Sequence, residues 1–167
     1  PSFHYEPAHD EFEPAAIRLP WEERPVNFLA GQFARDHGVE VPGRLIASAK
    51  SWMCHSGVDR TSDILPWQAG SDVTRLPPAT VCAHYLLHMR QAWNAAHPAH
   101  PMEHQDVVIT VPASFDEVAR ELTISAATQA GLPRVILLEE PQAAFYNWIR
   151  QQGEAWTSMV REGETML

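Results

Sequence analysis

The strongest pattern of apolar and polar positions lies in residues 107–148 and predicts a strand–helix–strand–helix unit. Residues 107–111 are β-branched and largely apolar, as expected for a strand buried on both faces. A second apolar run occupies residues 135–138 and ends at Glu139 and Glu140. Because ligands gather outside the carboxyl ends of strands in open α/β sheets, this acidic pair marks a candidate site.

Sequence signals also define the two helices of this unit. Ser114 and Glu117 have the spacing of a capping box, which predicts the start of the first helix. Gly131 follows the expected last residue, Ala130, at a position where glycine commonly ends a helix. Pro141 suits the first turn of the second helix, which we expect to extend to about residue 152.

The first forty residues predict short strands joined by turns. Strand-like pieces occur at residues 2–5, 15–19 and 26–29, and prolines separate them. A short helix is expected at residues 32–36, ending at Gly38. This spacing favours a small antiparallel sheet.

The middle of the chain combines two helical patterns with a long turn-rich segment. Residues 44–52 carry apolar side chains on one helical face, and residues 77–94 predict a long amphipathic helix. Between them, residues 54–78 are rich in proline and glycine and predict turns.

Composition narrows the class of protein. The 167 residues are enough for one good core, and the net charge of −9 argues against nucleic acid or an anionic membrane as partner. No apolar run approaches the roughly 20 residues that span a bilayer, and no signal peptide is visible. Cys54 and Cys82 are expected to be reduced thiols rather than a disulfide. We therefore expect a cytoplasmic protein.

Lys50 and the acidic pair are the residues with candidate chemistry. Lys50 is the only lysine, beside eleven arginines, and offers a compact point charge; it also fits a solvated surface position. Glu139 or Glu140 is suited to cap the following helix, whose dipole favours a carboxylate. The same carboxylates suit a hydrated cation.

Other catalytic and metal signatures are weak or missing. His84 and His88 stand four residues apart on a predicted helix, a geometry that can bind zinc, but Tyr85 replaces the glutamate of the metalloprotease motif. We expect satisfied or exposed histidines and no metal site there. The sequence contains no serine nucleophile elbow, Walker loop or dinucleotide fingerprint.

Residues 107–144, VVITVPASFDEVARELTISAATQAGLPRVILLEEPQAA, closely resemble the nucleotide-binding domain of the seventy-kilodalton heat-shock chaperones of the DnaK type. Pro112, Arg120, Gly131, Glu140 and Pro141 fall on the family pattern without a gap. Upstream, the segment ending at Lys50 and the opening Pro-Ser-Phe also resemble family segments.

The resemblance implies an α/β fold, namely part of an actin-like ATPase lobe of the ribonuclease H type. Residues 1–105 would form a peripheral subdomain around a small antiparallel sheet, and residues 106–167 part of the central subdomain. It also implies a fragment of an ATP-dependent chaperone that uses ATP/ADP with Mg²⁺. Unfolded client peptides and co-chaperones would be the partners, with no nucleic acid and no membrane.

The resemblance assigns roles to four residues. Lys50 and Glu140 match catalytic and nucleotide-binding positions, the lysine at the γ-phosphate and the glutamate near the magnesium and its waters. Pro112 and Arg120 match an allosteric relay that reports the nucleotide state to a peptide-binding domain. These roles are expectations that follow from the likeness.

Departures from the family pattern leave alternatives open. The glycine-rich phosphate loops and the adenosine site are absent from this sequence, so the 167 residues alone are expected to bind ATP weakly and to be inactive. Ser114 and Glu139 replace the family's aromatic residue and asparagine. An actin-like assembly or scaffold protein and a sugar-kinase-type phosphotransferase are the alternative functions.

Overall fold

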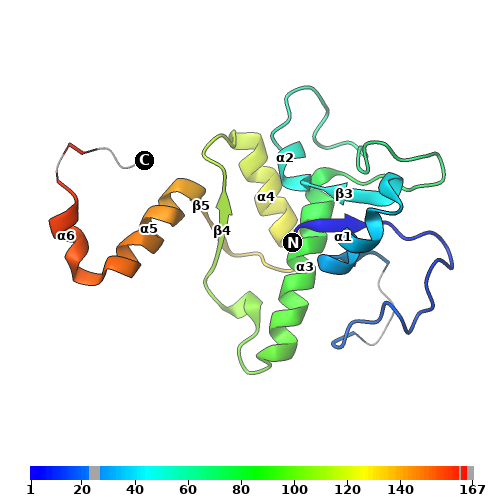
Figure 1. Ribbon diagram of the computed structural model, residues 1–167, viewed down its shortest axis with the longest axis horizontal. Helices are drawn as coiled ribbons and strands as arrows, with labels where there is room; N and C mark the ends of the chain where they lie inside the picture. Colours follow the sequence, from blue (N-terminus) through cyan, green and yellow to red (C-terminus); the bar gives the residue numbers. More distant parts are fainter. Residues whose placement is uncertain (23–26, 162, 165–167) are drawn as a thin grey trace.

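The computed structural model describes residues 1–22, 27–161 and 163–164, and it shows a mixed α/β protein with two small sheets (Figure 1). The strands of the first sheet lie in the order β2-β1-β3, and those of the second are β4 and β5. The strands are β1 (Phe3–Tyr5), β2 (Leu29–Ala30), β3 (Leu45–Ala47), β4 (Val107–Val111) and β5 (Val135–Glu139). The helices are α1 (Gln32–Gly38), α2 (Ala49–Trp52), α3 (Pro78–Ala96), α4 (Glu117–Gln129), α5 (Glu140–Gln152) and α6 (Trp156–Met159), with short 3-10 turns at Pro42–Arg44, Met102–His104 and Gly153–Ala155.

The first sheet is antiparallel and confirms the expectation for the N-terminal segment. His4 on β1 pairs with Ala30 on one side and Ile46 on the other. Helix α1 packs on this sheet, and Tyr5, Leu29 and Ala34 form its buried centre. The strand expected at residues 15–19 is wrong, because that proline-flanked segment forms turns. Residue 26, expected to begin a strand, lies outside the described residues.

The helix expected at residues 44–52 is also wrong over its first half. Residues 45–47 form β3, Ser48 adopts a left-handed conformation with φ of 56°, and only then does the one-turn helix α2 begin. The apolar spacing suited either element, and pairing with β1 decides between them because it satisfies the backbone of Ile46. Ile46 remains buried, packed with Ala49, Leu65 and Val81.

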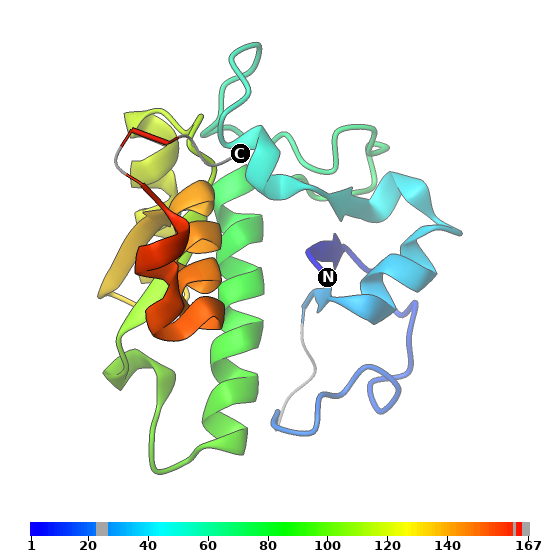
Figure 2. The ribbon, with the colours of Figure 1, turned by 60° about the vertical axis from the view of Figure 1, so that its left-hand side comes forward.

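Helix α3 is the central support of the structure, as its long amphipathic pattern predicted. It stands between the N-terminal sheet and the β4–β5 unit in both views (Figure 1 and Figure 2). It packs against α2 and α4, and Val81 is fully buried. Across the described part of the chain, no helix is long and apolar enough to cross a membrane.

The second sheet confirms the predicted strand–helix–strand–helix unit. Strands β4 and β5 are parallel, with Val111 opposite Glu139, and α4 connects them. The expectation that the strand at residues 107–111 is buried on both faces is wrong, since Val108 is 51% exposed. Its neighbour on β5, Ile136, is 60% exposed. Helix α4 is on one side of the strands, while α5 extends away from the body of the molecule (Figure 1).

The ends of α4 follow backbone rules that the sequence indicated only in part. Asp116, rather than Ser114, is the N-cap, and its side chain accepts a hydrogen bond from the Ala119 N–H. At the other end, Gly131 has φ of +80°, and Leu132 N–H donates to the Ala127 carbonyl at 2.8 Å. The predicted helix end at Gly131 is confirmed, and its hydrogen bonds are those of a Schellman motif.

Candidate functional site

Lys50 and Glu140 contact each other although 90 residues separate them in the chain. The Lys50 Nζ donates to Glu140 Oε1 and also to the carbonyl oxygen of Thr110 on β4, at 3.1 Å. Lys50 comes from the single turn of α2, and Glu140 is the first residue of α5. The fold therefore unites the two candidate residues from opposite halves of the chain.

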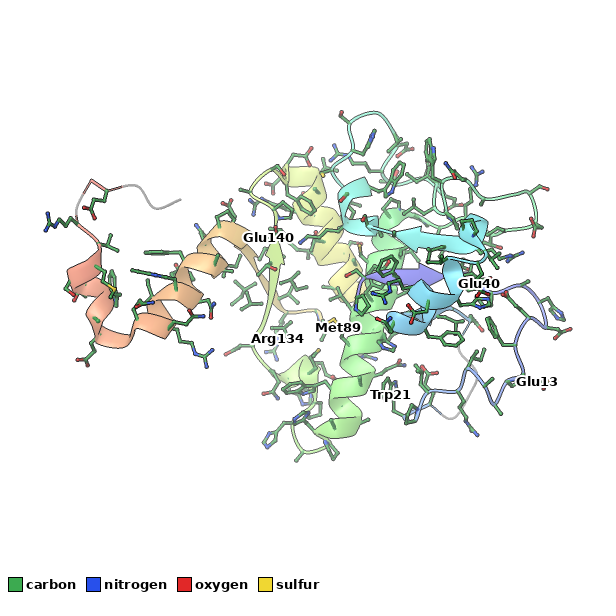
Figure 3. The ribbon with its side chains drawn as sticks, in the orientation of Figure 1. Glu13, Trp21, Glu40, Met89, Arg134 and Glu140 are labelled. Carbon is green, nitrogen blue, oxygen red and sulfur yellow. The ribbon has the colours of Figure 1, made fainter. Side chains whose placement is uncertain are left out.

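This contact lies at the carboxyl ends of β4 and β5, the edge at which α/β sheets place ligands. Figure 3 shows Glu140 where β5 passes into α5. The side chains of Lys50 and Glu140 are 41% and 48% exposed, so both remain accessible to a ligand from solvent. An exposed ammonium beside a carboxylate offers one charge for an anion and one for a hydrated cation.

The neighbouring carboxylate, Glu139, has a different cationic partner. Arg120 Nη2 on α4 donates to Glu139 Oε1 at 2.8 Å. Pro112 begins the turn between β4 and α4, and its carbonyl accepts from the Phe115 N–H at 3.1 Å. Thus Arg120 is tied to the strand end that leads into Glu140, whereas Pro112 is placed at the end of the adjacent strand.

Arg60 and Asp116 form a further ion pair at the N-terminus of α4, and sequence reasoning missed both residues. Arg60 Nη1 is 2.8 and 2.9 Å from the two Asp116 carboxylate oxygens, and 3.1 Å from the carbonyl of Met53. The hydrogen bonds from Arg60 and from the Ala119 N–H hold the pKa of Asp116 below its ordinary value. Arg60 lies in a turn-rich segment without periodicity, so no spacing signal pointed to it.

Lys50 and Glu140 fit a phosphate and a hydrated Mg²⁺, but they supply only part of such a site. Among the described residues, no group of three or more histidine, cysteine, aspartate or glutamate side chains could hold a metal ion. Magnesium keeps several waters and needs only one or two protein carboxylates together with substrate phosphates. Glu140 supplies one such carboxylate. Lys50 suits a phosphate as a point charge.

The histidines and cysteines match the structural role expected for them. His84 Nδ1 is 2.8 Å from His4 Nε2, and its ring stacks on Phe28 at a centroid distance of 4.0 Å. Cys54 and Cys82 are free thiols that pack against the same apolar cluster. Burial raises the pKa of the Cys82 thiol to about 12, which keeps it protonated and unreactive.

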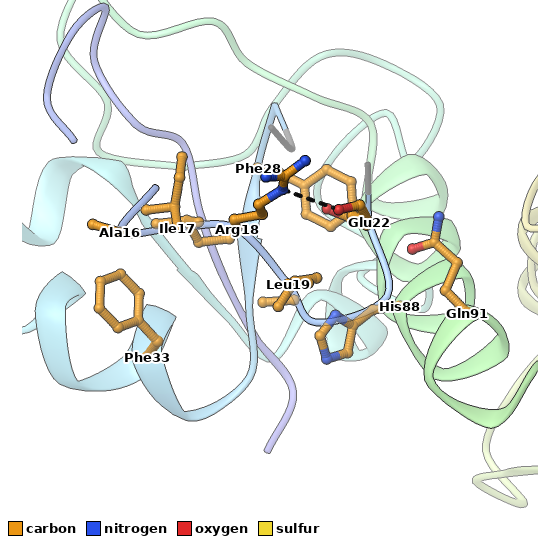
Figure 4. A pocket seen from close by; sticks show the side chains of 11 residues that line it. Ala16, Ile17, Arg18, Leu19, Glu22, Phe28, Phe33, His88 and Gln91 are labelled. Carbon is orange, nitrogen blue, oxygen red and sulfur yellow. Dashed lines mark hydrogen bonds between the residues drawn. The ribbon is translucent and has the colours of Figure 1, made fainter. Parts of the chain in front are cut away.

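A separate cavity of about 180 Å³ lies between the N-terminal loop, α1 and α3 (Figure 4). Its lining is largely apolar, with Ile17, Leu19, Phe28 and Phe33 contributing side chains. Neither Lys50 nor a residue of β4 or β5 lines it. It is therefore distinct from the charged junction.

Comparison with known proteins defines the class. Residues 23–148 match the family model described as Hsp70 protein. The chain belongs to the Hsp70 family. It is 31% identical over 134 residues to the heat shock 70 kDa protein BIP3 of Oryza sativa subsp. japonica, and 35% identical over 123 residues to the chaperone protein HscA of Salmonella newport (strain SL254). These matches cover 70% and 68% of this chain but 20% of each relative.

Proposed function

We propose that these residues are part of the nucleotide-binding domain of an ATP-dependent chaperone, in which ATP hydrolysis switches a peptide-binding domain. The contact of Lys50 with Glu140 at the ends of β4 and β5 carries this proposal. Residues 1–105 then belong to a peripheral subdomain and residues 106–167 to the central actin-like one. Family membership favours this function over an actin-like scaffold or a sugar kinase.

Lys50 would act on the transferring phosphoryl group as a fixed positive charge. MgATP, when bound, supplies that group and the metal that neutralises its neighbouring oxygens. The Thr110 carbonyl holds the Lys50 ammonium at the strand ends, so little reorganisation is needed when charge develops on the phosphoryl oxygens. Lys50 thus stabilises the transition state more than it contributes to affinity.

Glu140 would order water on the metal side of the same site. Its carboxylate accepts from Lys50 in this structure, which orients it toward the junction rather than along α5. Carboxylates bind Mg²⁺ directly or through its retained waters. Glu140 would then position water, and Lys50 would supply the positive charge.

Arg120 and Pro112 would connect this site to the rest of the protein. Arg120 holds Glu139, the residue before Glu140, so a shift of Glu140 on nucleotide exchange is passed to α4. Pro112 sits at the end of β4, two residues after Thr110, which holds Lys50. Client peptides and co-chaperones would respond to this movement.

The proposal is tested in the full-length gene product. Lys50→Ala should lower the single-turnover rate of ATP hydrolysis about 100- to 1000-fold, while the dissociation constant for ATP changes little. Arg134→Ala is the matched control, since Arg134 is an exposed cation in the loop before β5. An unchanged turnover rate in the Lys50 variant would contradict the assignment.

Two further measurements separate binding from switching. Fluorescent peptide release on ATP addition should fail in Arg120→Ala while ATP binding persists; release at the normal rate would remove Arg120 from the relay. The polypeptide of residues 1–167 alone should show only weak ATP binding in calorimetry, because its sequence contains no glycine-rich phosphate loop. A micromolar dissociation constant would contradict that expectation.

A further inference from the structure

Three ion pairs and one hydrogen bond connect α2, α4 and the β5–α5 junction. Lys50 on α2 contacts Glu140, while Arg120 on α4 contacts Glu139. The third pair, Arg60–Asp116, joins the N-cap of α4 to the loop that follows α2. Arg60 also donates to the carbonyl of Met53, the C-cap of α2. The first two pairs meet at adjacent residues, and the contacts of Arg60 with Asp116 and with the Met53 carbonyl lead from α4 back to α2.

Helix α2 needs such external support because it has only four residues, Ala49–Trp52. One turn fixes several dihedral angles for very few hydrogen bonds and is not stable alone. Met53, its C-cap, is 2% exposed and packs with Val111, Phe115 and Ala119. Ala49, at the start of α2, is fully buried with Ile46, Leu65 and Val81, so apolar packing holds both ends of the turn.

Arg60 adds a polar contact between the end of α2 and the N-cap of α4. Its Nη1 donates to the Met53 carbonyl at the end of α2 and to both oxygens of Asp116. The Arg60 side chain is only 20% exposed, so the contact is shielded on the arginine side. All three contacts come from Nη1, whose two hydrogens can serve the Met53 carbonyl and the Asp116 carboxylate.

We propose that Arg60 is a positioning residue for Lys50: by fastening the end of α2 to the N-cap of α4, it holds Lys50 against Thr110 and Glu140. This inference rests on the proposed function of Lys50 for its effect on hydrolysis, but its geometric part does not. Small displacements of a charged group remote from a mutated residue can cost one to two orders of magnitude in rate.

The first test measures geometry without nucleotide. Lys50 is the only lysine in residues 1–167, so its acylation by an amine-reactive reagent can be followed by mass spectrometry of its peptide. In the full-length gene product, Arg60→Met should increase the acylation rate of Lys50 several-fold as the lysine leaves Glu140. Arg75→Met is the control: Arg75 lies in the same turn-rich segment and donates to the Ala69 carbonyl instead.

The second test uses single-turnover hydrolysis in a double-mutant design. Arg60→Met should slow hydrolysis about 10-fold or more, with the ATP dissociation constant changed less than about 2-fold. In a Lys50→Ala background, Arg60→Met should add nothing, because its effect acts through Lys50. A second variant, Asp116→Asn, keeps an N-cap acceptor but removes the charge, and should reproduce the Arg60 effect if the fold is intact.

The outcomes separate the two claims. If Lys50→Ala leaves hydrolysis intact, the proposed function fails. The acylation rate of Lys50 in Arg60→Met still tests whether Arg60 positions Lys50. If Lys50→Ala abolishes hydrolysis but Arg60→Met changes neither hydrolysis nor acylation, Arg60 is a surface contact and the inference is overturned. Additive losses in the double variant also overturn it, since they indicate general destabilisation.

Discussion

Arg120 and Glu139 form a 2.8 Å ion pair directly beside the contact of Lys50 with Glu140. Two consecutive carboxylates at one strand end therefore face two cations from different helices. The Arg120 and Glu139 side chains are 28% and 36% exposed, and a single pair of atoms carries the contact. Partly solvated pairs of this kind contribute little to stability.

A double-mutant cycle measures the strength of that pair. For Arg120→Met and Glu139→Gln, we expect a coupling free energy of about 0.2–1 kcal/mol in urea unfolding of residues 1–167. Glu121→Gln, on the exposed side of α4, is the control and should show no coupling with Arg120→Met. A coupling above about 2 kcal/mol would instead make the pair a structural contact.

The N-cap of α4 gives a second prediction. Asp116→Ala removes both the acceptor for the Ala119 N–H and the partner of Arg60. The melting temperature should fall by about 2–6 °C for a domain of this size. Ser114→Ala, at the position that the sequence pattern favours, should change it by less than about 1 °C. Equal losses in the two variants would show that the capping box at Ser114 operates in solution.

Local patterns predicted much of the fold. The β4–α4–β5–α5 unit and α3 have apolar periods that suit only one element, and backbone sterics at Gly131 and Pro141 fix their ends. The helix predicted at residues 45–47 is wrong because Leu45 and Ile46 fit a helical face as well as a strand. Only the pairing with β1 decides between the two elements. The choice between Asp116 and Ser114 likewise depends on backbone geometry that spacing alone does not determine.

The site was predictable only in part, for a related reason. Lys50 and Glu140 were candidates on charge and family likeness, but no local pattern shows that they contact each other. Arg60 reaches Asp116 across 56 residues from a segment without periodicity. Contacts of this kind arise from tertiary packing of α2 on β4 and α4, which a sequence pattern does not contain.

Gly131 gives a third prediction, because two effects act there together. Its φ of +80° disfavours any other residue, and an added Cβ would lie 1.5 Å from Arg90 Nη1. Gly131→Ala should cost about 1–2 kcal/mol for the backbone, plus the displacement of Arg90. The matched control is Gly131→Ala made in an Arg90→Ala background, which keeps the same backbone strain and removes the side chain that the added Cβ would meet. If Gly131→Ala loses the same free energy of unfolding in both backgrounds, Arg90 moves without cost.

His4 gives a prediction about pH. Its side chain is fully buried between β1 and α3, and burial, with a smaller contribution from the neighbouring His84, lowers its pKa to about 3. Because the folded pKa lies below the unfolded value of 6.5, the unfolded state takes up the proton first on acidification. The stability that His4 contributes is therefore full above pH 6.5 and is lost as the pH falls toward 3.

Glu6 opposes this trend, since its Oε1 is 3.5 Å from His4 Nδ1 and burial raises the pKa of Glu6 to about 7. The test must therefore compare variants rather than follow one protein. Between pH 7 and 5.5, wild type should lose about 1 kcal/mol relative to His4→Gln, in which the Glu6 contribution is largely retained. Urea unfolding at both pH values measures the difference. A difference independent of pH would mean that folding leaves the pKa of His4 unchanged. A gain of stability by wild type over this range would mean that His4 is protonated in the folded protein, with Glu6 as its charged partner.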